Sequence, residues 1–184
     1  MKIDFSKPVL VASGFSKGAF LCMDGEGLLK SIGSGGGKVT CQSSCDSNTA
    51  KFHFHDQGDG TFTIESVQYP GIFLRMNGGG VRSFANNGTG EVNCQFGAGS
   101  WERFRLHEQE IPQGKMNQLI SKGSLVTIES VAFPDVFLRM KKDEQGSGIV
   151  NCQYGAKEDE TFYLFNPIDA SSVGDLGNLG MQGI

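Results

Sequence analysis

Apolar residues occur at every second position in many short stretches of this chain, which is typical of β-strands with one buried face. In Val92-Asn93-Cys94, for example, the outer two side chains point to one face and the middle one to the other. Gly, Asn, Asp and Pro separate these stretches, and helical periodicity is absent. The pattern predicts an all-β protein built from short strands and turns.

The chain also repeats itself. Residues 63–76 are matched almost position for position by residues 127–140, 64 positions later. A second pair of segments, 88–95 and 146–153, repeats at an offset of 58 and shares a Gly-x-Gly-x-Val-x-Cys-Gln pattern, of which 35–42 is a third copy. Repeats of this length each form one supersecondary unit that buries its apolar face against its neighbours.

Three units of about four strands each predict a β-trefoil. We place the single domain at 1–167, with repeats at about 8–60, 61–121 and 122–167. Residues 168–184 carry glycines at a period of three and few strand signals, so we expect a flexible C-terminal tail there.

Composition narrows the possible functions. The 184 residues are 38% hydrophobic, enough for one globular core, and the net charge of −4 disfavours nucleic acid and anionic membranes as partners. The first residues have no apolar stretch of signal-peptide length, and five cysteines at wide spacing do not form a disulfide framework. We therefore expect a cytoplasmic, monomeric protein with reduced thiols.

Residues 64–67 and 70–75, with 159–162 near the end of the third unit, resemble the arabinofuranosidase-B-type carbohydrate-binding module. The units of that β-trefoil family read approximately "ESV-x-x-PG-x-x-LRH" and then "DATF". More distantly, the three-fold plan is similar to fascin and hisactophilin, which are cytoplasmic trefoils that bind actin. The resemblance implies the trefoil fold and a sugar-binding role.

In the carbohydrate-binding family, the histidine of "LRH" and the aspartate of "DATF" are expected to hold sugar hydroxyls. The three histidine positions are methionine here, and methionine gives no directional hydrogen bond. Asp159 keeps the aspartate, whereas Trp101 replaces it in the second unit and either stacks on a sugar or is partly buried at a barrel edge. The positions are Met23, Met76 and Met140 for histidine, and Thr49, Trp101 and Asp159 for aspartate.

Glu65 with Arg75, and Glu129 with Arg139, recur at identical spacing on neighbouring strand-like segments. A hairpin would place these opposite charges side by side, so each pair is either a structural ion pair or part of a ligand-binding rim. The first unit has Ala12 and Cys22 at these positions, which indicates that the members of each pair act together.

Two further clusters have alternative interpretations. Cys41, Cys94 and Cys152 occupy the same place in the three units and form either a buried core layer or a three-thiolate metal site. His53 and His55 share one face of a strand, where they bind a metal or simply face solvent. We favour the structural interpretation in both cases and predict neither a metal nor a cofactor.

The sequence thus predicts a non-catalytic binding module, since no recurrent carboxylate pair suits glycoside hydrolysis. Carbohydrate binding at surface pockets of the repeats is the leading hypothesis, with Asp159 and Trp101 as ligand-binding residues and Glu65, Arg75, Glu129 and Arg139 as rim groups. The alternative is a fascin-like protein-interaction module whose partner is actin or another protein.

Overall fold

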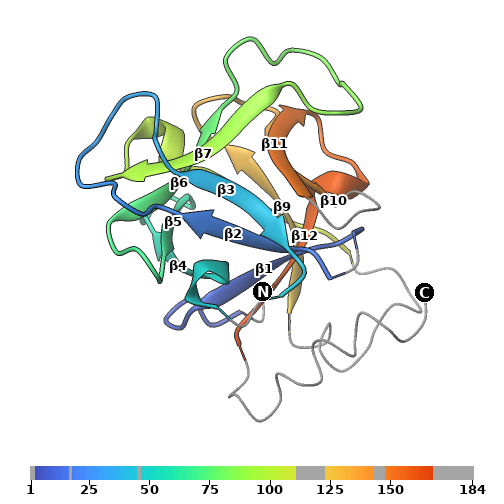
Figure 1. Cartoon of the computed structure of the whole chain (residues 1–184). Helices are drawn as coiled ribbons and strands as arrows, with labels where there is room; N and C mark the ends of the chain where they lie inside the picture. Colours follow the sequence, from blue (N-terminus) through green and yellow to red (C-terminus); the bar gives the residue numbers. More distant parts are fainter. Residues whose placement is uncertain (1–2, 17, 45–46, 111–122, 143–147, 168–184) are drawn as a thin grey trace.

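The computed structural model describes residues 3–16, 18–44, 47–110, 123–142 and 148–167; the predicted tail at 168–184 lies outside them. Twelve β-strands lie within the described residues (Figure 1). They are β1 (Val9–Ser13), β2 (Phe20–Asp24), β3 (Lys38–Gln42), β4 (Lys51–Asp56), β5 (Phe62–Ser66), β6 (Ile72–Asn77), β7 (Gly90–Phe96), β8 (Phe104–Glu108), β9 (Ser124–Ser130), β10 (Val136–Lys142), β11 (Gly148–Tyr154) and β12 (Thr161–Phe165). Short 3-10 helices η1 (Asn48–Ala50), η2 (Ser100–Glu102) and η4 (Glu158–Glu160) precede β4, β8 and β12.

The first and last strand of each unit form a closed, six-stranded antiparallel barrel. Around the barrel, β1 pairs with β4, β4 with β5, β5 with β8, β8 with β9, β9 with β12, and β12 returns to β1. Closure leaves this ring of strands without an exposed edge. Unit one contains β1 to β4, unit two β5 to β8, and unit three β9 to β12.

The two middle strands of each unit form a hairpin, and the three hairpins β2–β3, β6–β7 and β10–β11 cap the barrel. Strands β3, β7 and β11 lie next to one another on the near side in Figure 1, and β7 also pairs with β11. Six barrel strands with three capping hairpins form a β-trefoil, so the predicted fold is confirmed. No helix in the described part of the chain has the length and apolar composition of a membrane span.

Buried side chains from all three units fill the barrel and the space under the cap. Met23, Met76 and Met140, which the predicted resemblance aligns with histidines of the carbohydrate-binding family, are fully buried there. Methionine suits this depth, because an unpaired imidazole there would lose its hydrogen bonds to water. These three positions belong to the core, where they do not contact a ligand.

The cysteines lie at the centre of the cap. The thiols of Cys41, Cys94 and Cys152 each lie against the backbone of another unit, with Cys94 Sγ 3.4 Å from the carbonyl oxygen of Asp24 and Cys152 Sγ 3.6 Å from that of Asn77. Burial raises the pKa of Cys94 and of Cys152 to about 12, so neither thiol is ionised at neutral pH. These cysteines form the predicted core layer.

The recurring glycines of the hairpin turns give the cysteines room. A methyl group added at Gly37, Gly90 or Gly148 would collide with the sulfur of a cysteine from another unit. Two residues before Gly37 and Gly90, Gly35 and Gly88 have φ angles of 73° and 67°, in the left-handed region that favours glycine. The Gly-x-Gly pattern therefore encodes a repeated turn that locks each hairpin onto another.

Candidate functional site

Arg139 is the centre of a buried polar network at the edge of unit three. Its side chain lies on β10 and is only 2% exposed. Nη2 donates to Asp159 Oδ2 at 2.9 Å and to the carbonyl oxygen of Asn86 at 3.0 Å. Nη1 donates to the carbonyl oxygen of Asn87 at 3.2 Å and to Asn151 Oδ1 at 3.3 Å. One guanidinium thus links β10, β11, η4 and the β6–β7 loop of unit two.

Glu160 is the second carboxylate of this network. Its Oε1 accepts from Gln153 Nε2 at 2.5 Å and lies 3.6 Å from Arg139 Nε, while Oε2 accepts from the backbone N–H of Lys157 at 2.7 Å. Burial raises the pKa of Glu160, and the negative charge of Asp159 adds to this shift, against the opposing effects of the Lys157 amide and of Arg139. The Glu160 carboxylate therefore fixes η4, the turn that carries Asp159.

A surface groove of about 920 Å³ runs along this network. Its lining combines the polar groups Asp159, Lys141 and Asn86 with aromatic and aliphatic side chains. The groove is lined by Gly14, Phe15, Phe84, Asn86, Gln109, Leu125, Thr127, Lys141, Gln153, Ala156, Lys157, Glu158, Asp159, Glu160, Thr161 and Tyr163. A concave site with mainly apolar walls and a few oriented polar groups has the composition of a ligand pocket.

Asp159 presents a carboxylate oxygen to this groove. Its Oδ2 is held by Arg139 and lies 3.9 Å from Lys141 Nζ, while Oδ1 has no hydrogen-bond partner among the described residues. The Asp159 side chain is 16% exposed and that of Lys141 is 52% exposed. An oriented acceptor and a mobile donor therefore stand side by side at the groove wall.

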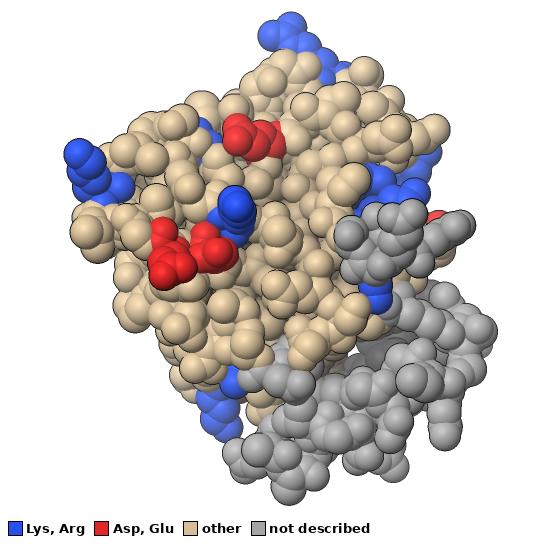
Figure 2. All heavy atoms as spheres, in the orientation of Figure 1, with Lys and Arg blue, Asp and Glu red and all other residues tan. Residues whose placement is uncertain are grey.

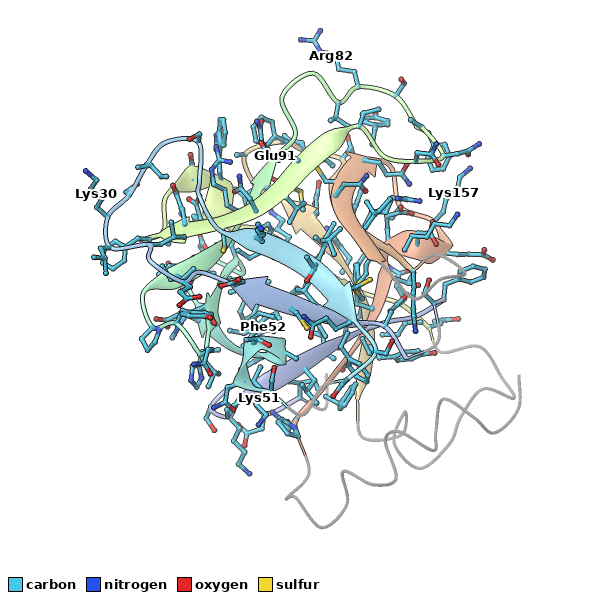
Figure 3. All side chains as sticks on the ribbon, in the orientation of Figure 1. Lys30, Lys51, Phe52, Arg82, Glu91 and Lys157 are labelled. Carbon is cyan, nitrogen blue, oxygen red and sulfur yellow. The ribbon has the colours of Figure 1, made fainter. Side chains whose placement is uncertain are left out.

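Lys157, the residue that precedes η4, makes a cation–π contact with unit two. Lys157 Nζ lies 3.7 Å from the ring centroid of Phe84, which belongs to the β6–β7 loop of unit two. Figure 3 shows Lys157 beside the β10–β11 hairpin, whereas Arg82 of the same loop as Phe84 extends away from the body of the protein. Residues other than Lys, Arg, Asp and Glu cover most of the face seen in Figure 2.

Unit two contains the same network with one change. Arg75 is 2% exposed, donates from Nη2 to the carbonyl oxygen of Gly33 at 2.8 Å, and lies 3.7 Å from Glu102 through Nε. At the position of Asp159 stands Trp101, whose ring lies 4.4 Å from the Arg75 guanidinium and contacts Phe133 edge-on. One face of the indole is therefore covered, which is the partial burial that the sequence left open for Trp101.

The predicted pairing of Glu65 with Arg75 and of Glu129 with Arg139 is wrong. Strands β5 and β6 pair at Glu65 and Phe73 only, because β6 leaves the barrel to form the cap and carries Arg75 away from β5. Glu65 instead accepts from the backbone N–H of Gly71 at 2.6 Å and lies 2.6 Å from His55 Nε2. The arginines are buried partners of Glu102 and Glu160, so they do not form an exposed rim.

Glu129 repeats the arrangement of Glu65, with the backbone N–H of Asp135 at 2.8 Å and His107 Nε2 at 2.7 Å. His55 and His107 therefore each hydrogen-bond to a glutamate, Glu65 and Glu129 respectively. The His53 and His55 rings lie 6.1 Å apart, and no group of three His, Cys, Asp or Glu side chains in the described part of the chain is arranged to hold a metal ion.

Sequence reasoning missed half of the network. Glu102 and Glu160 were not singled out, nor were Asn93 and Asn151, although each pair recurs at equivalent positions. The usable signal lies in unit one, where Cys22 replaces the arginine and Thr40 and Ala50 replace the asparagine and the glutamate. Residues that disappear together from one repeat are candidates for one network.

Comparison with known proteins supports the fold and leaves the family open. No protein-family model and no curated protein sequence matches the chain. Among solved structures, the designed three-fold symmetric protein ThreeFoil aligns with 89% of this chain and 100% of its own, at 14% identity and a TM-score of 0.53. The Haemophilus ducreyi cytolethal distending toxin aligns with 90% of this chain and 86% of its own, at 15% identity and a TM-score of 0.58.

Two larger proteins contain a similar fold. A mosquitocidal holotoxin matches 88% of this chain over 17% of its own length, at 10% identity and a TM-score of 0.59. The Polyporus squamosus lectin, solved with the epitope Neu5Aca2-6Galb1-4GlcNAc, matches 86% of this chain over 48% of its own length, at 11% identity and a TM-score of 0.55. At these identities the likeness establishes the β-trefoil fold, and the arabinofuranosidase-B-type and fascin-like assignments stay predictions.

Proposed function

We propose that this protein is a non-catalytic binding module that recognises a carbohydrate in the groove beside Asp159. The observation that carries the proposal is the Asp159 carboxylate: Asp159 lines a groove of about 920 Å³, Arg139 holds its Oδ2, and its Oδ1 has no hydrogen-bond partner among the described residues. An acceptor fixed from behind loses little conformational entropy when it binds a hydroxyl group.

The chemistry of the groove suits a sugar. Of two neighbouring hydroxyl groups, one can donate to Asp159 Oδ1 while the other accepts from the Lys141 ammonium, because a hydroxyl both donates and accepts. Phe15 and Tyr163, which also line the groove, offer apolar surface for the C–H face of a sugar ring.

Unit three is the most suitable repeat for this role. In unit two, Trp101 occupies the place of Asp159 and already packs on Arg75 and Phe133. In unit one, the place is taken by Thr49 and the arginine by Cys22. We therefore propose one principal site, with Asp159 as its central residue. The lectin among the structural neighbours, which was solved with a glycan, supports the class of ligand.

A glycan array followed by calorimetric titration of the best ligand tests this function. Asp159→Asn is the informative variant, because Arg139 still requires an acceptor and the amide nitrogen must then face the groove. The variant replaces an acceptor by a donor without changing the shape of the site. We expect it to lower affinity about tenfold or more, as expected when a buried polar contact is left unmatched.

Trp101→Leu is the matched control, since it changes the equivalent position in unit two. We expect unchanged affinity for the same glycan. A loss of binding in Trp101→Leu with normal binding in Asp159→Asn would move the site to unit two. A protein that binds no glycan on the array would refute carbohydrate recognition, and co-sedimentation with actin filaments would then test the protein-binding alternative.

A further inference from the structure

Arg139 joins the two walls of the groove, which come from different units. Asp159 belongs to η4 of unit three, whereas Phe84 and Asn86 belong to the β6–β7 loop of unit two. The Nη2 atom of Arg139 contacts both sides at once, with Asp159 Oδ2 at 2.9 Å and the carbonyl oxygen of Asn86 at 3.0 Å. A single buried side chain therefore contacts groove residues of both units.

Asn151 supports the same loop contact from β11. Its Nδ2 donates to the carbonyl oxygen of Asn87 at 2.6 Å, and its Oδ1 accepts from Arg139. Gly88 has a φ of 67° and packs against the Asn151 side chain with no room for a Cβ atom. The loop is therefore held at two consecutive carbonyl groups and by a turn that only glycine fits.

Unit two provides an internal reference for this arrangement. Arg75 donates to the carbonyl oxygen of Gly33, and Asn93 Nδ2 donates to that of Ser34 at 2.9 Å, so they hold the β2–β3 loop of unit one in the same way. Arg75, however, contacts the ring of Trp101 where Arg139 contacts a carboxylate. The loop clamp is common to both units, and the link to an oriented carboxylate is specific to unit three.

We propose that Arg139 is the positioning residue of the groove: it fixes the Asp159 carboxylate and the β6–β7 loop of unit two relative to each other and so sets the geometry in which a ligand is bound. This inference rests on the proposed function for the ligand, while the clamp itself is a property of the unbound protein. Arg139 is buried, so it acts on the ligand through Asp159, Asn86 and Phe84.

The shape of the guanidinium is essential to this role. Its planar fork serves the Asp159 carboxylate, two loop carbonyls and the Asn151 amide together, and an ammonium group cannot reproduce that geometry. Arg139→Lys keeps the positive charge beside Glu160 and Asp159 but lacks the planar arrangement of donors of the guanidinium group. The equivalent variant Arg75→Lys is the matched control, because Arg75 is equally buried.

Amide hydrogen exchange of the unbound protein provides the first readout. We expect Arg139→Lys to speed exchange at residues 78–89 about tenfold or more, since charge-assisted hydrogen bonds to the loop are lost. Arg75→Lys should speed exchange in the β2–β3 loop and leave residues 78–89 unchanged. Equal exchange of residues 78–89 in Arg139→Lys and the wild type would overturn the proposal, whether or not a glycan ligand exists.

Affinity for the best array glycan provides the second readout. We expect about a tenfold loss in Arg139→Lys and no change in Arg75→Lys. Unchanged affinity in Arg139→Lys would overturn the positioning role, even with a faster exchanging loop. If wild-type protein binds no glycan, the proposed function fails, and the exchange experiment alone decides on the clamp.

A second pair of variants covers the case in which Arg139→Lys does not fold. Asn151→Ala removes the hydrogen bond to the Asn87 carbonyl and leaves no buried charge behind, and Asn93→Ala is its counterpart in unit two. We expect Asn151→Ala to speed exchange at residues 78–89 and to weaken glycan binding in the same direction as Arg139→Lys. Identical behaviour of the two alanine variants in both readouts would overturn the proposal.

Discussion

The three units are alike where their hairpins meet and unlike one layer further out. In the cap, Cys41, Cys94 and Cys152 each contact the backbone of another unit, with a glycine opposite every sulfur. In the outer layer, units two and three bury an arginine with a glutamate, whereas unit one has Cys22 and Ala50 in a small apolar cluster with Leu10 and Phe20.

This difference shows which features the fold needs. A trefoil closes only if the three hairpins fit together at the axis, so the packing there is the same in every unit. In the outer layer, side chains need only to fill the space and every buried polar group needs a partner. Both an apolar cluster and an ion pair meet these requirements. The outer layer is therefore free to differ between units and to carry a binding site.

The largest expected effect comes from breaking the ionic layer of unit two at one residue. Glu102→Ala leaves the Arg75 guanidinium buried without a carboxylate partner among the described residues. We expect a loss of about 3–5 kcal/mol in the free energy of unfolding, which is the usual result of removing one member of a buried pair. Urea denaturation followed by circular dichroism measures this loss.

Converting the whole layer of unit two to the residues of unit one should cost less. The variant with Arg75→Cys, Asn93→Thr and Glu102→Ala removes the charge together with its partners, so its cost is that of the cavity left by smaller side chains and no longer that of an unpaired buried charge. We expect the triple variant to be more stable than Glu102→Ala alone. A triple variant less stable than the single one would show that the ionic layer is required by the fold.

A smaller effect is expected from disturbing the cap. Gly90→Ala places a methyl group against the sulfur of Cys152, and such overpacking costs about 1–3 kcal/mol. Removing the sulfur as well, with Cys152→Ala, should relieve the severest contact of the added methyl group and leave the contacts of 3.0 Å with the Asn77 carbonyl oxygen and Val81. Thermal unfolding of the two single variants and of the double variant measures this coupling; strictly additive effects would contradict the proposed collision.

The pH dependence of stability separates two glutamates of unit three. Burial raises the pKa of Glu160 in the folded protein above its ordinary value of 4.5. As pH falls, the carboxylate of Glu160 is therefore protonated in the folded state before it is protonated in the unfolded state, and the folded state gains stability. Burial alone would raise the pKa of Glu129, but hydrogen bonds from the Asp135 amide and from His107 lower it. The ionised Glu129 therefore stabilises the folded state above pH 4.5, and this stabilisation is lost as pH falls below 4.5.

Glu160→Gln and Glu129→Gln test these signs. As pH falls from neutral toward 4.5, wild-type protein should gain stability relative to Glu160→Gln. Below pH 4.5, it should lose stability relative to Glu129→Gln. Urea denaturation across this pH range measures both differences, and parallel curves for wild type and Glu160→Gln would show that the buried carboxyl group has an ordinary pKa.

The smallest effect is expected at the exposed histidine of the barrel. His55 is 47% exposed and its partner Glu65 is 18% exposed, so solvent screens the pair. We expect His55→Ala to reduce the free energy of unfolding by about 0.2–1 kcal/mol. Glu65 also holds the β5–β6 turn through the Gly71 amide, so Glu65→Ala should be the more destabilising variant in the same denaturation experiment.

The internal repeats made the fold predictable, but they led to a wrong assignment of which charged side chains pair with each other. The three predicted units each contain four strands, β1 to β4, β5 to β8 and β9 to β12. The same spacing argument paired Glu65 with Arg75, because it treated β5 and β6 as one continuous hairpin. A strand that crosses from barrel to cap breaks that assumption.

The sequence by itself determined the strands, the turns, the three units and the residues that recur in them, because alternation and glycine placement are local properties of the chain. Only the tertiary structure decided which charges meet. Arg139 finds Asp159 and Glu160 from its own unit and the Asn86 and Asn87 carbonyls from another. Such contacts arise where separate hairpins pack around an axis, and no spacing along one segment records them.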